Sequence, residues 1–262
     1  MCISWLKYFF KEKEEQVVGV QTGSTEPVIV STDEPETGNV ENNEPIIELP
    51  IPKPYEGTDI HVLLDNGHAS STPGKRQQLE NGQYFYEYKF NREIVHIIAE
   101  ELDKLGIPYE IIVPEVDEDI ALSTRAARAN SFCTKYGKNK CLFISIHSNA
   151  CGDGVTFTKA KGWEVWTTKG QTKSDEFATI LFEEAEKILP KYSMTTRKDM
   201  SDGDPDKEEN FTVIYKTWCP AVLTENMFFT NRDEVRWIMS DEGKNAIADI
   251  HVNAIKRMID EA

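Results

Sequence analysis

Cys141-Leu-Phe-Ile-Ser-Ile-His147 is an almost continuous apolar run that ends in a histidine. A run of this length, rich in isoleucine and flanked by polar residues, is typical of a strand that is buried on both faces. Similar runs alternate along the chain with segments of helical periodicity, which predicts an α/β fold around a mostly parallel, mixed sheet of about six strands. The expected strands cover residues 59–65, 108–114, 141–147, 162–168, 211–216 and 221–225.

Helical periodicity places helices between these strands, so that both faces of the sheet are covered. We expect one α/β domain over residues 59–262. Residues 1–58 are acidic overall and without any period, which predicts a largely disordered tail. The polar stretch 190–210 is predicted to be a long surface loop. The expected helices cover residues 87–105, 121–136, 173–189, 231–239 and 241–259.

The composition argues against several classes of protein. The 262 residues carry a formal net charge of −16 and no basic run longer than two residues, which argues against binding to nucleic acid. No stretch approaches the roughly 18 to 20 apolar residues of a membrane span, so we expect no integral membrane segment. Residues 1–10 lack the basic start and the cleavage site of a standard secretory signal. They would suit either a short helix attached to a membrane surface or an end that frays into solvent. The five cysteines form no CxxC pair and are interpreted as mostly buried, reduced thiols.

Three ionisable residues lie at or just after the carboxyl ends of expected strands: His68, His147 and Glu225. If the strands are parallel, these ends meet at one edge of the sheet, where ligands bind in open α/β folds. A fourth residue, Glu87, is in line with the apolar stripe of the first expected helix, so its carboxylate starts on the buried side. A buried carboxylate needs a cation or strong donors, and a metal ion would supply the charge. The alternative is a first-turn glutamate that the helix dipole favours.

Two imidazoles and one carboxylate form a common ligand set of catalytic zinc, with one position open for water. Magnesium and calcium prefer oxygen ligands, so the histidines favour zinc, with manganese and cobalt as alternatives. Hydrolysis at such a site also needs a carboxylate that moves a proton to the leaving nitrogen, and Glu225 is the candidate. His61 and His251 are expected to be structural, and His96 to lie at the surface.

The stretch Val62-Leu-Leu-Asp-Asn-Gly-His68 resembles the hydrophobic-Asp-Pro-Gly-His opening of the zinc N-acetylmuramoyl-L-alanine amidases, also called the amidase 3 family. Further segments are similar to motifs of that family, in the same order along the chain, which makes the signal specific. The departures are Asn66 in place of proline and Ala69-Ser70 in place of glycines. The further segments are Glu87-Tyr-Lys-Phe-Asn91, Leu122-Ser-Thr-Arg125 with Ala129-Asn130, Phe143-Ile-Ser-Ile-His-Ser-Asn-Ala150, and Pro220-Ala-Val-Leu-Thr-Glu-Asn-Met-Phe228 with Asn231.

The resemblance implies a peptidoglycan hydrolase that cleaves the amide bond between N-acetylmuramic acid and L-alanine. It implies that His68, Glu87 and His147 bind one Zn²⁺ ion and that Glu225 is the catalytic carboxylate. Peptidoglycan is then the partner, and we expect a monomer that acts on the bacterial cell wall, in the periplasm or outside the cell. A chain without a standard signal would suit a phage or prophage lysin that is made in the cytoplasm and released through a holin. A host enzyme of wall remodelling is the alternative origin.

Other functions stay open at this point. A zinc peptidase that acts within the stem peptides would use a similar ligand set, and an inactive relative would bind wall fragments only. An α/β domain with purely structural histidines and glutamates would contain no metal. Asp65 and Asn149 are candidates for orienting His68 and His147, or for a structural role in turns. Three tryptophans, Trp163, Trp166 and Trp218, are interpreted as core residues rather than as stacking partners of a substrate.

Overall fold

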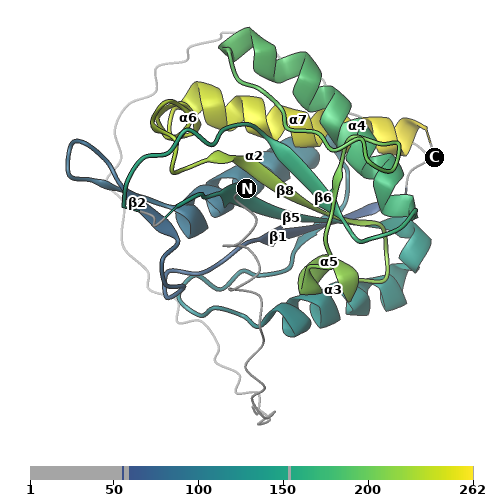
Figure 1. The fold of residues 1–262 in the computed structure, drawn as a ribbon. Helices are drawn as coiled ribbons and strands as arrows, with labels where there is room; N and C mark the ends of the chain where they lie inside the picture. The colour runs from purple at the N-terminus through teal and green to yellow at the C-terminus, as the bar shows by residue number, and fades with distance from the viewer. Residues whose placement is uncertain (1–54, 56–58, 153–154, 262) are drawn as a thin grey trace, which may run out of the picture. The chain divides into compact units, whose positions relative to one another are not determined.

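A computed structural model describes Tyr55 and residues 59–152 and 155–261. Its centre is a six-stranded sheet with the strand order β4-β1-β5-β8-β6-β7 (Figure 1). Strands β4, β1, β5 and β8 are parallel to one another, β6 is antiparallel to β8, and β7 is parallel to β6. The predicted mixed, mostly parallel sheet is therefore confirmed. The strands are β1 His61–Asn66, β4 Tyr109–Ile111, β5 Cys141–Asn149, β6 Glu164–Thr167, β7 Lys207–Glu208 and β8 Ala221–Phe228.

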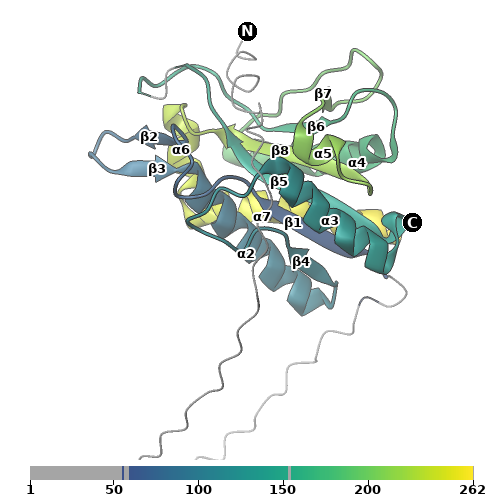
Figure 2. The same cartoon turned by 90° about the horizontal axis from the view of Figure 1, so that it is seen from below.

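Helices cover both faces of this sheet, as predicted (Figures 1 and 2). Helix α2 (Glu87–Leu105) buries its apolar stripe and ends at Gly106, which has a left-handed φ of 71° that glycine adopts without strain. On the same face lie α4 (Lys173–Ile188) and α7 (Asp241–Asp260), whereas α3 (Leu122–Tyr136) and the short α5 (Thr212–Tyr215) cover the other. Helix α6 (Arg232–Ile238) joins the end of β8 to α7.

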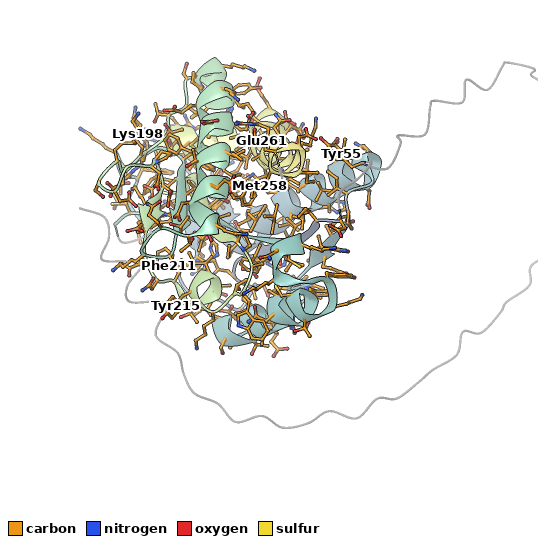
Figure 3. The ribbon with its side chains drawn as sticks, turned by 90° about the vertical axis from the view of Figure 1, so that its right-hand side faces the viewer. Tyr55, Lys198, Phe211, Tyr215, Met258 and Glu261 are labelled. Carbon is orange, nitrogen blue, oxygen red and sulfur yellow. The ribbon has the colours of Figure 1, made fainter. Side chains whose placement is uncertain are left out.

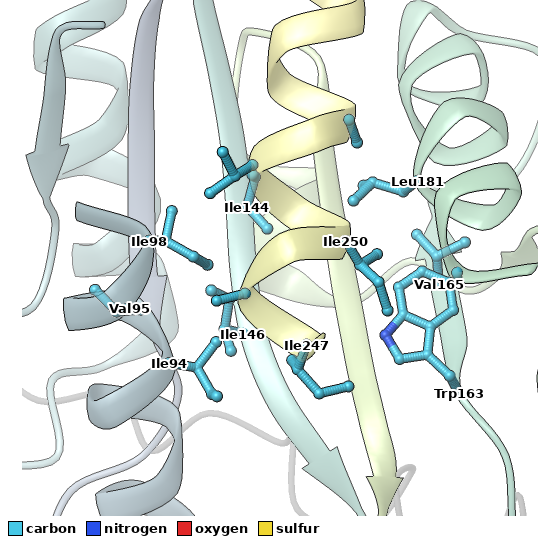
Figure 4. Close-up of a cluster of buried hydrophobic side chains, with 14 of the residues drawn as sticks. Ile94, Val95, Ile98, Ile144, Ile146, Trp163, Val165, Leu181, Ile247 and Ile250 are labelled. Carbon is cyan, nitrogen blue, oxygen red and sulfur yellow. The ribbon is translucent and has the colours of Figure 1, made fainter. Parts of the chain in front are cut away.

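Two clusters of buried side chains hold these layers together. The larger one lies between the sheet and helices α2, α4 and α7, and it contains Ile144 and Ile146 of β5 (Figure 4). The smaller one lies under α3 and α5 and contains Phe143 of the same strand. Because side chains alternate along a strand, Ser145 and His147 follow Phe143 toward the α3 side at the carboxyl end of β5.

Three segments differ from the expectation or add to it. The strand expected at residues 211–216 is wrong, because these residues form the single helical turn α5. Figure 3 shows Phe211 and Tyr215 of this region on the side of the domain opposite Met258. A short apolar run with β-branched residues fits a buried helical turn as well as a strand. Residues 190–210 contain β7 and a bridge between Trp163 and Thr196, so this stretch is partly ordered against the sheet. A hairpin of β2 (Arg76–Gln78) and β3 (Tyr84–Tyr86), not predicted from the sequence, precedes α2.

Three further expectations concern the tail, membrane-spanning helices and the cysteines. The predicted disordered tail lies outside the described residues, apart from Tyr55. Among the described helices, none is long and apolar enough to cross a membrane. Three cysteines, Cys133, Cys141 and Cys219, are buried free thiols, as predicted.

Candidate active site

His68 follows β1 and is held in an unusual backbone conformation. Its φ is +64°, in the left-handed region that few non-glycine residues adopt. Arg92 of α2 fixes the turn, because its guanidinium donates hydrogen bonds to the carbonyl oxygens of His68 (2.9 Å) and Glu115 (2.5 Å). A strained backbone conformation that surrounding residues stabilise is typical of functional positions. Here it directs the imidazole toward the carboxyl end of the sheet.

Glu87 is the first residue of α2, and its side chain is 1% exposed. Its Oε1 lies 3.3 Å from His68 Nε2 and 3.1 Å from His147 Nδ1, and it accepts a hydrogen bond of 3.2 Å from the amide of Ser148. Its Oε2 lies 3.7 Å from Lys75 Nζ. The buried position that the helical stripe predicted for Glu87 is confirmed, and the carboxylate joins the two histidines.

His147 lies near the end of β5, with its ring 4.8 Å from the ring of His68. Gly67 makes room for it: a Cβ at Gly67 would lie 2.1 Å from His147 Cε1. The second ring nitrogen, Nε2, lies 3.2 Å from Ser145 Oγ, which in turn donates to Asp65 Oδ2 at 2.6 Å. The buried Arg125 holds Asp65 through a 3.0 Å ion pair. A polar chain of buried groups therefore orients this imidazole.

Glu225 lies beside His147, because the two residues are neighbours in the parallel pairing of β5 and β8. Its side chain is buried and its Oε2 has no hydrogen-bond partner. The sheet topology thus brings together all four residues that the sequence singled out.

Three charged residues beside Glu225 were missed in the sequence. Glu164 of β6 pairs with Glu225 across the antiparallel strands and is 1% exposed. Its Oε1 binds Arg197 Nε at 2.6 Å and Lys207 Nζ at 2.9 Å. A glutamate inside the apolar run Trp163-Glu-Val-Trp166 was a usable signal, because a buried carboxylate requires a cationic partner. The two cations come from the stretch 190–210, which sequence periodicity does not place.

The pKa values of the two glutamates at this site, Glu87 and Glu225, are shifted in opposite directions. Burial by itself raises the pKa of Glu87, but His68, Lys75 and the hydrogen bond from His147 outweigh it and hold this pKa well below the usual range. Burial also lowers the pKa of His68 to about 4, so its imidazole is neutral at pH 7, as a metal ligand requires. Burial, with the charge of Glu87, raises the pKa of Glu225 well above its usual range. A proton carrier needs such a raised pKa.

The donor set fits a zinc ion. One atom from each of His68, Glu87 and His147 lies within 4.8 Å of one from each of the others. Two buried atoms of this set, His68 Nε2 and Glu87 Oε2, have no hydrogen-bond partner. Two nitrogens and one carboxylate oxygen are a ligand set that zinc prefers over magnesium or calcium.

The remaining histidines and tryptophans lie away from this cluster or in the core. His61 stacks on Tyr136 with ring centroids 3.4 Å apart, and His251 is buried between Thr224 and the carbonyl of Ile247. His96 is 74% exposed and pairs with Glu100. The structural and surface positions expected for these histidines agree with the fold. Trp163 and Trp166 are buried, as expected, whereas Trp218 is 63% exposed, so the core position expected for Trp218 is wrong.

Two residues considered as orienting groups contact other partners than expected. Asp65 reaches the ring of His147, rather than that of His68, through the hydroxyl of Ser145. Asn149 donates to Glu164 Oε2 at 3.4 Å and accepts from the amide of Ala150, so it supports the second carboxylate rather than His147.

Comparison with known proteins points to one family. The family model of N-acetylmuramoyl-L-alanine amidases matches residues 62–257. An endolysin of Bacillus phage SPP1 is 28% identical over 204 residues, which are 76% of this chain and 65% of that protein. The N-acetylmuramoyl-L-alanine amidase CwlM of Bacillus licheniformis is 25% identical over 201 residues, covering 76% of this chain and 68% of the relative. This chain thus spans about two thirds of these curated relatives.

A solved structure gives the same result. The crystal structure of the N-acetylmuramoyl-L-alanine amidase from Clostridium difficile 630 superposes with a TM-score of 0.62 at 26% identity, over 77% of this chain and 97% of that one. Its match includes the mixed sheet and the helices around it, which positions the four residues of the cluster on a fold known to carry an amidase. The chain belongs to the N-acetylmuramoyl-L-alanine amidase family.

Proposed function

We propose that this chain is a peptidoglycan amidase that hydrolyses the bond between the lactyl group of N-acetylmuramic acid and L-alanine. His68, Glu87 and His147 hold one zinc ion, and Glu225 is the general base and acid. The observation that carries the proposal is the buried Glu225 carboxylate, whose Oε2 has no hydrogen-bond partner, beside a set of two imidazoles and one carboxylate. Family membership supports the substrate and the bond that is cleaved.

The residues of the site have distinct roles in this reaction. A zinc ion at these ligands would lower the pKa of a water molecule and polarise the scissile carbonyl. Glu225 takes the proton from the attacking water and delivers it to the alanine nitrogen as the C–N bond breaks. Its raised pKa suits the second step, because the protonated carboxyl is then a ready donor. Ser145 and Asp65 keep the imidazole of His147 in one orientation.

The reaction is tested with isolated peptidoglycan and the purified chain. We expect newly exposed L-alanine amino groups, released stem peptides without sugar, and loss of both with a chelator. Shortened stem peptides would indicate a zinc peptidase instead. Soluble fragments with no new amino termini would contradict any amidase.

The assignment of Glu225 is tested with Glu225→Gln. Removal of a general acid and base typically costs about 10²- to 10⁴-fold in rate. We expect a loss of that size in kcat, with stoichiometric zinc retained by elemental analysis. His147→Ala is the contrasting variant, because it loses zinc as well as activity. If Glu225→Gln hydrolysed the substrate as fast as the wild type, Glu225 would not be the general base.

The phage relative supports a role as a lysin, with the cell wall as the place of action. Under this proposal the chain is monomeric and reaches the wall after synthesis in the cytoplasm. Expression in a host cell together with a pore-forming holin should cause lysis, and expression of the Glu225→Gln variant should not. Lysis without a holin would point to another route of export.

A further inference from the structure

A second group of acidic residues lies outside the zinc site. Asp175, at the start of α4, meets Asp204 and Asp206 of the loop before β7, with one oxygen of each within 4.8 Å of one oxygen of each of the others. Asp175 is 5% and Asp206 1% exposed. Three carboxylates at this distance repel one another strongly when they are buried.

The hydrogen bonds of the cluster leave one oxygen of every carboxylate without a partner. Asp206 Oδ2 accepts from Thr167 Oγ1 at 2.5 Å, Asp204 Oδ2 accepts from Gln171 at 3.2 Å, and Asp175 Oδ2 accepts from the amide of Thr172. The three Oδ1 atoms are buried and unpartnered. Two of these side chains are more than nine-tenths buried, so their free oxygens are not satisfied by bulk water.

In the part of the chain that the structure describes, no lysine, arginine or histidine is among the groups that act most on Asp206. The groups that act most on it are Asp204, Thr167 and Asp175. Burial, Asp204 and Asp175 raise the pKa of Asp206 to about 8, and the hydrogen bond from Thr167 opposes this rise. The contrast with Glu164 is direct, because that buried carboxylate pairs with both Arg197 and Lys207.

We propose that Asp175, Asp204 and Asp206 bind a calcium ion. All donors are oxygens, and hard cations prefer them, whereas the zinc site has two imidazoles. Calcium suits a site assembled from a loop and a helix start, because it accepts irregular geometry that magnesium does not. With only three carboxylates from the protein, water completes the shell, and the dissociation constant is expected in the range of about 10⁻⁴ to 10⁻³ M.

The ion would connect three segments at the end of β6 that lies away from Glu225. Glu164 at the other end of β6 pairs with Glu225, whereas Ser174, next to Asp175, accepts a hydrogen bond from the amide of Ala221 at the start of β8. Asp175 belongs to α4, Thr167 ends β6, and Asp206 precedes Lys207 directly in the chain. Lys207 in turn binds Glu164, the neighbour of Glu225. Calcium would therefore hold the segment that carries Lys207 beside β6, whose first residue, Glu164, is the ion-pair partner of Lys207.

Titration of the full chain, loaded with zinc, tests this proposal. We expect calcium chloride at about 5 mM to raise the melting temperature by a few degrees, and magnesium at the same concentration to raise it by less. Terbium should bind in place of calcium and show luminescence sensitised by Trp166, whose ring lies 5.2 Å from Lys207 Nζ. Calcium should quench that signal by competition.

Variants assign the response to this cluster. Asp206→Asn and Asp204→Asn should each lose the calcium shift, and the second serves if the first does not fold. Asp199→Asn is the matched control, because this exposed residue of the same loop caps Ser201 and is not part of the cluster. Glu87→Gln should lose zinc and keep the calcium shift. The proposal would be overturned if calcium did not raise the melting temperature of the wild type, or if magnesium raised it as much. It would also be overturned if the calcium effect persisted in Asp204→Asn or disappeared in Glu87→Gln.

Discussion

Glu164 lies directly opposite Glu225 in the antiparallel pair of β6 and β8, so two buried carboxylates are cross-strand neighbours at the catalytic edge. Their surroundings differ. Glu164 is neutralised by Arg197 and Lys207, whereas Glu225 Oε2 has no hydrogen-bond partner. After burial and the charge of Glu87, Glu164 also contributes to the raised pKa of Glu225, and Lys207 opposes it. The second carboxylate thus acts on the proton affinity of the first.

Glu164→Gln should therefore shift the pH dependence of the reaction. Removing the negative charge, and releasing Lys207 from its ion pair, both lower the pKa of Glu225. The acidic limb of kcat/KM should move to lower pH by about one unit, the usual size of such an effect. The measurement is the pH profile of amide hydrolysis.

Glu184→Gln is the control for this change. Glu184 is also buried between a lysine and an arginine, Lys187 and Arg257, but it lies on α4 on the other face of the sheet. Removing the charge of Glu184 should leave the pH profile of kcat/KM unchanged. An acidic limb that does not move in Glu164→Gln would show that this residue has no electrostatic role.

Gly67→Ala should remove the metal without unfolding the domain. The new methyl group would lie 2.1 to 2.5 Å from three atoms of the His147 ring, so the imidazole must turn away from Glu87. We expect loss of zinc by elemental analysis and loss of activity, with an unchanged circular dichroism spectrum. Gly82→Ala is the control, since a Cβ there meets no atom and adds only backbone strain of about 1 to 2 kcal/mol. Full zinc content in Gly67→Ala would contradict this packing argument.

The sequence was sufficient for the positions of His68, His147 and Glu225, because the carboxyl ends of parallel strands meet whatever the details of packing. It was also sufficient for helix 87–105, whose apolar stripe is long and regular. Local pattern failed at residues 211–216, where one buried turn has the same composition as a strand. Asn81-Gly82 was a usable hairpin signal for β2 and β3 that the flanking polar residues obscured.

The rest of the site could not be predicted, because its contacts join distant parts of the chain. Arg197 and Lys207 belong to a stretch of loop character. The bridge between Trp163 and Thr196 brings Arg197 to Glu164, and the pairing of β7 with β6 brings Lys207 there. Ser145 was an unremarkable small residue inside a strand. Its importance follows from the positions of Asp65 on β1 and of the His147 ring, which no local period describes.

Ser145→Ala should weaken zinc binding while the fold is kept. The hydroxyl accepts from His147 Nε2 in the tautomer that leaves Nδ1 free to bind a metal, and it donates to Asp65. Loss of such an outer hydrogen bond typically costs about 10- to 100-fold in metal affinity. Competition with a chromophoric chelator measures it. Ser148→Ala is the matched control, because its buried hydroxyl donates to the carbonyl of Met227 instead; equal affinities in the two variants would reject the relay.

His251 should make the domain less stable in mild acid. Burial lowers its pKa to about 4, against about 6.5 in the unfolded chain, so the unfolded state binds more protons between these values. Stability from this residue is therefore complete above pH 6.5 and is lost as the pH falls to 4, by about 3 kcal/mol over the window. The tautomer agrees: Nδ1 donates to the carbonyl of Ile247, and Nε2 accepts from Thr224.

Denaturant unfolding of the wild type and of His251→Gln between pH 4 and pH 7 measures this contribution. Other groups, Glu87 among them, titrate in both proteins, so the difference between the two curves isolates His251. The variant should be less stable than the wild type at pH 7, and the gap should narrow or reverse toward pH 4. His96→Gln, which changes an exposed histidine, should run parallel to the wild type. Parallel curves for His251→Gln as well would mean that His251 takes up its proton at the same pH in the folded and the unfolded chain, and would contradict the prediction.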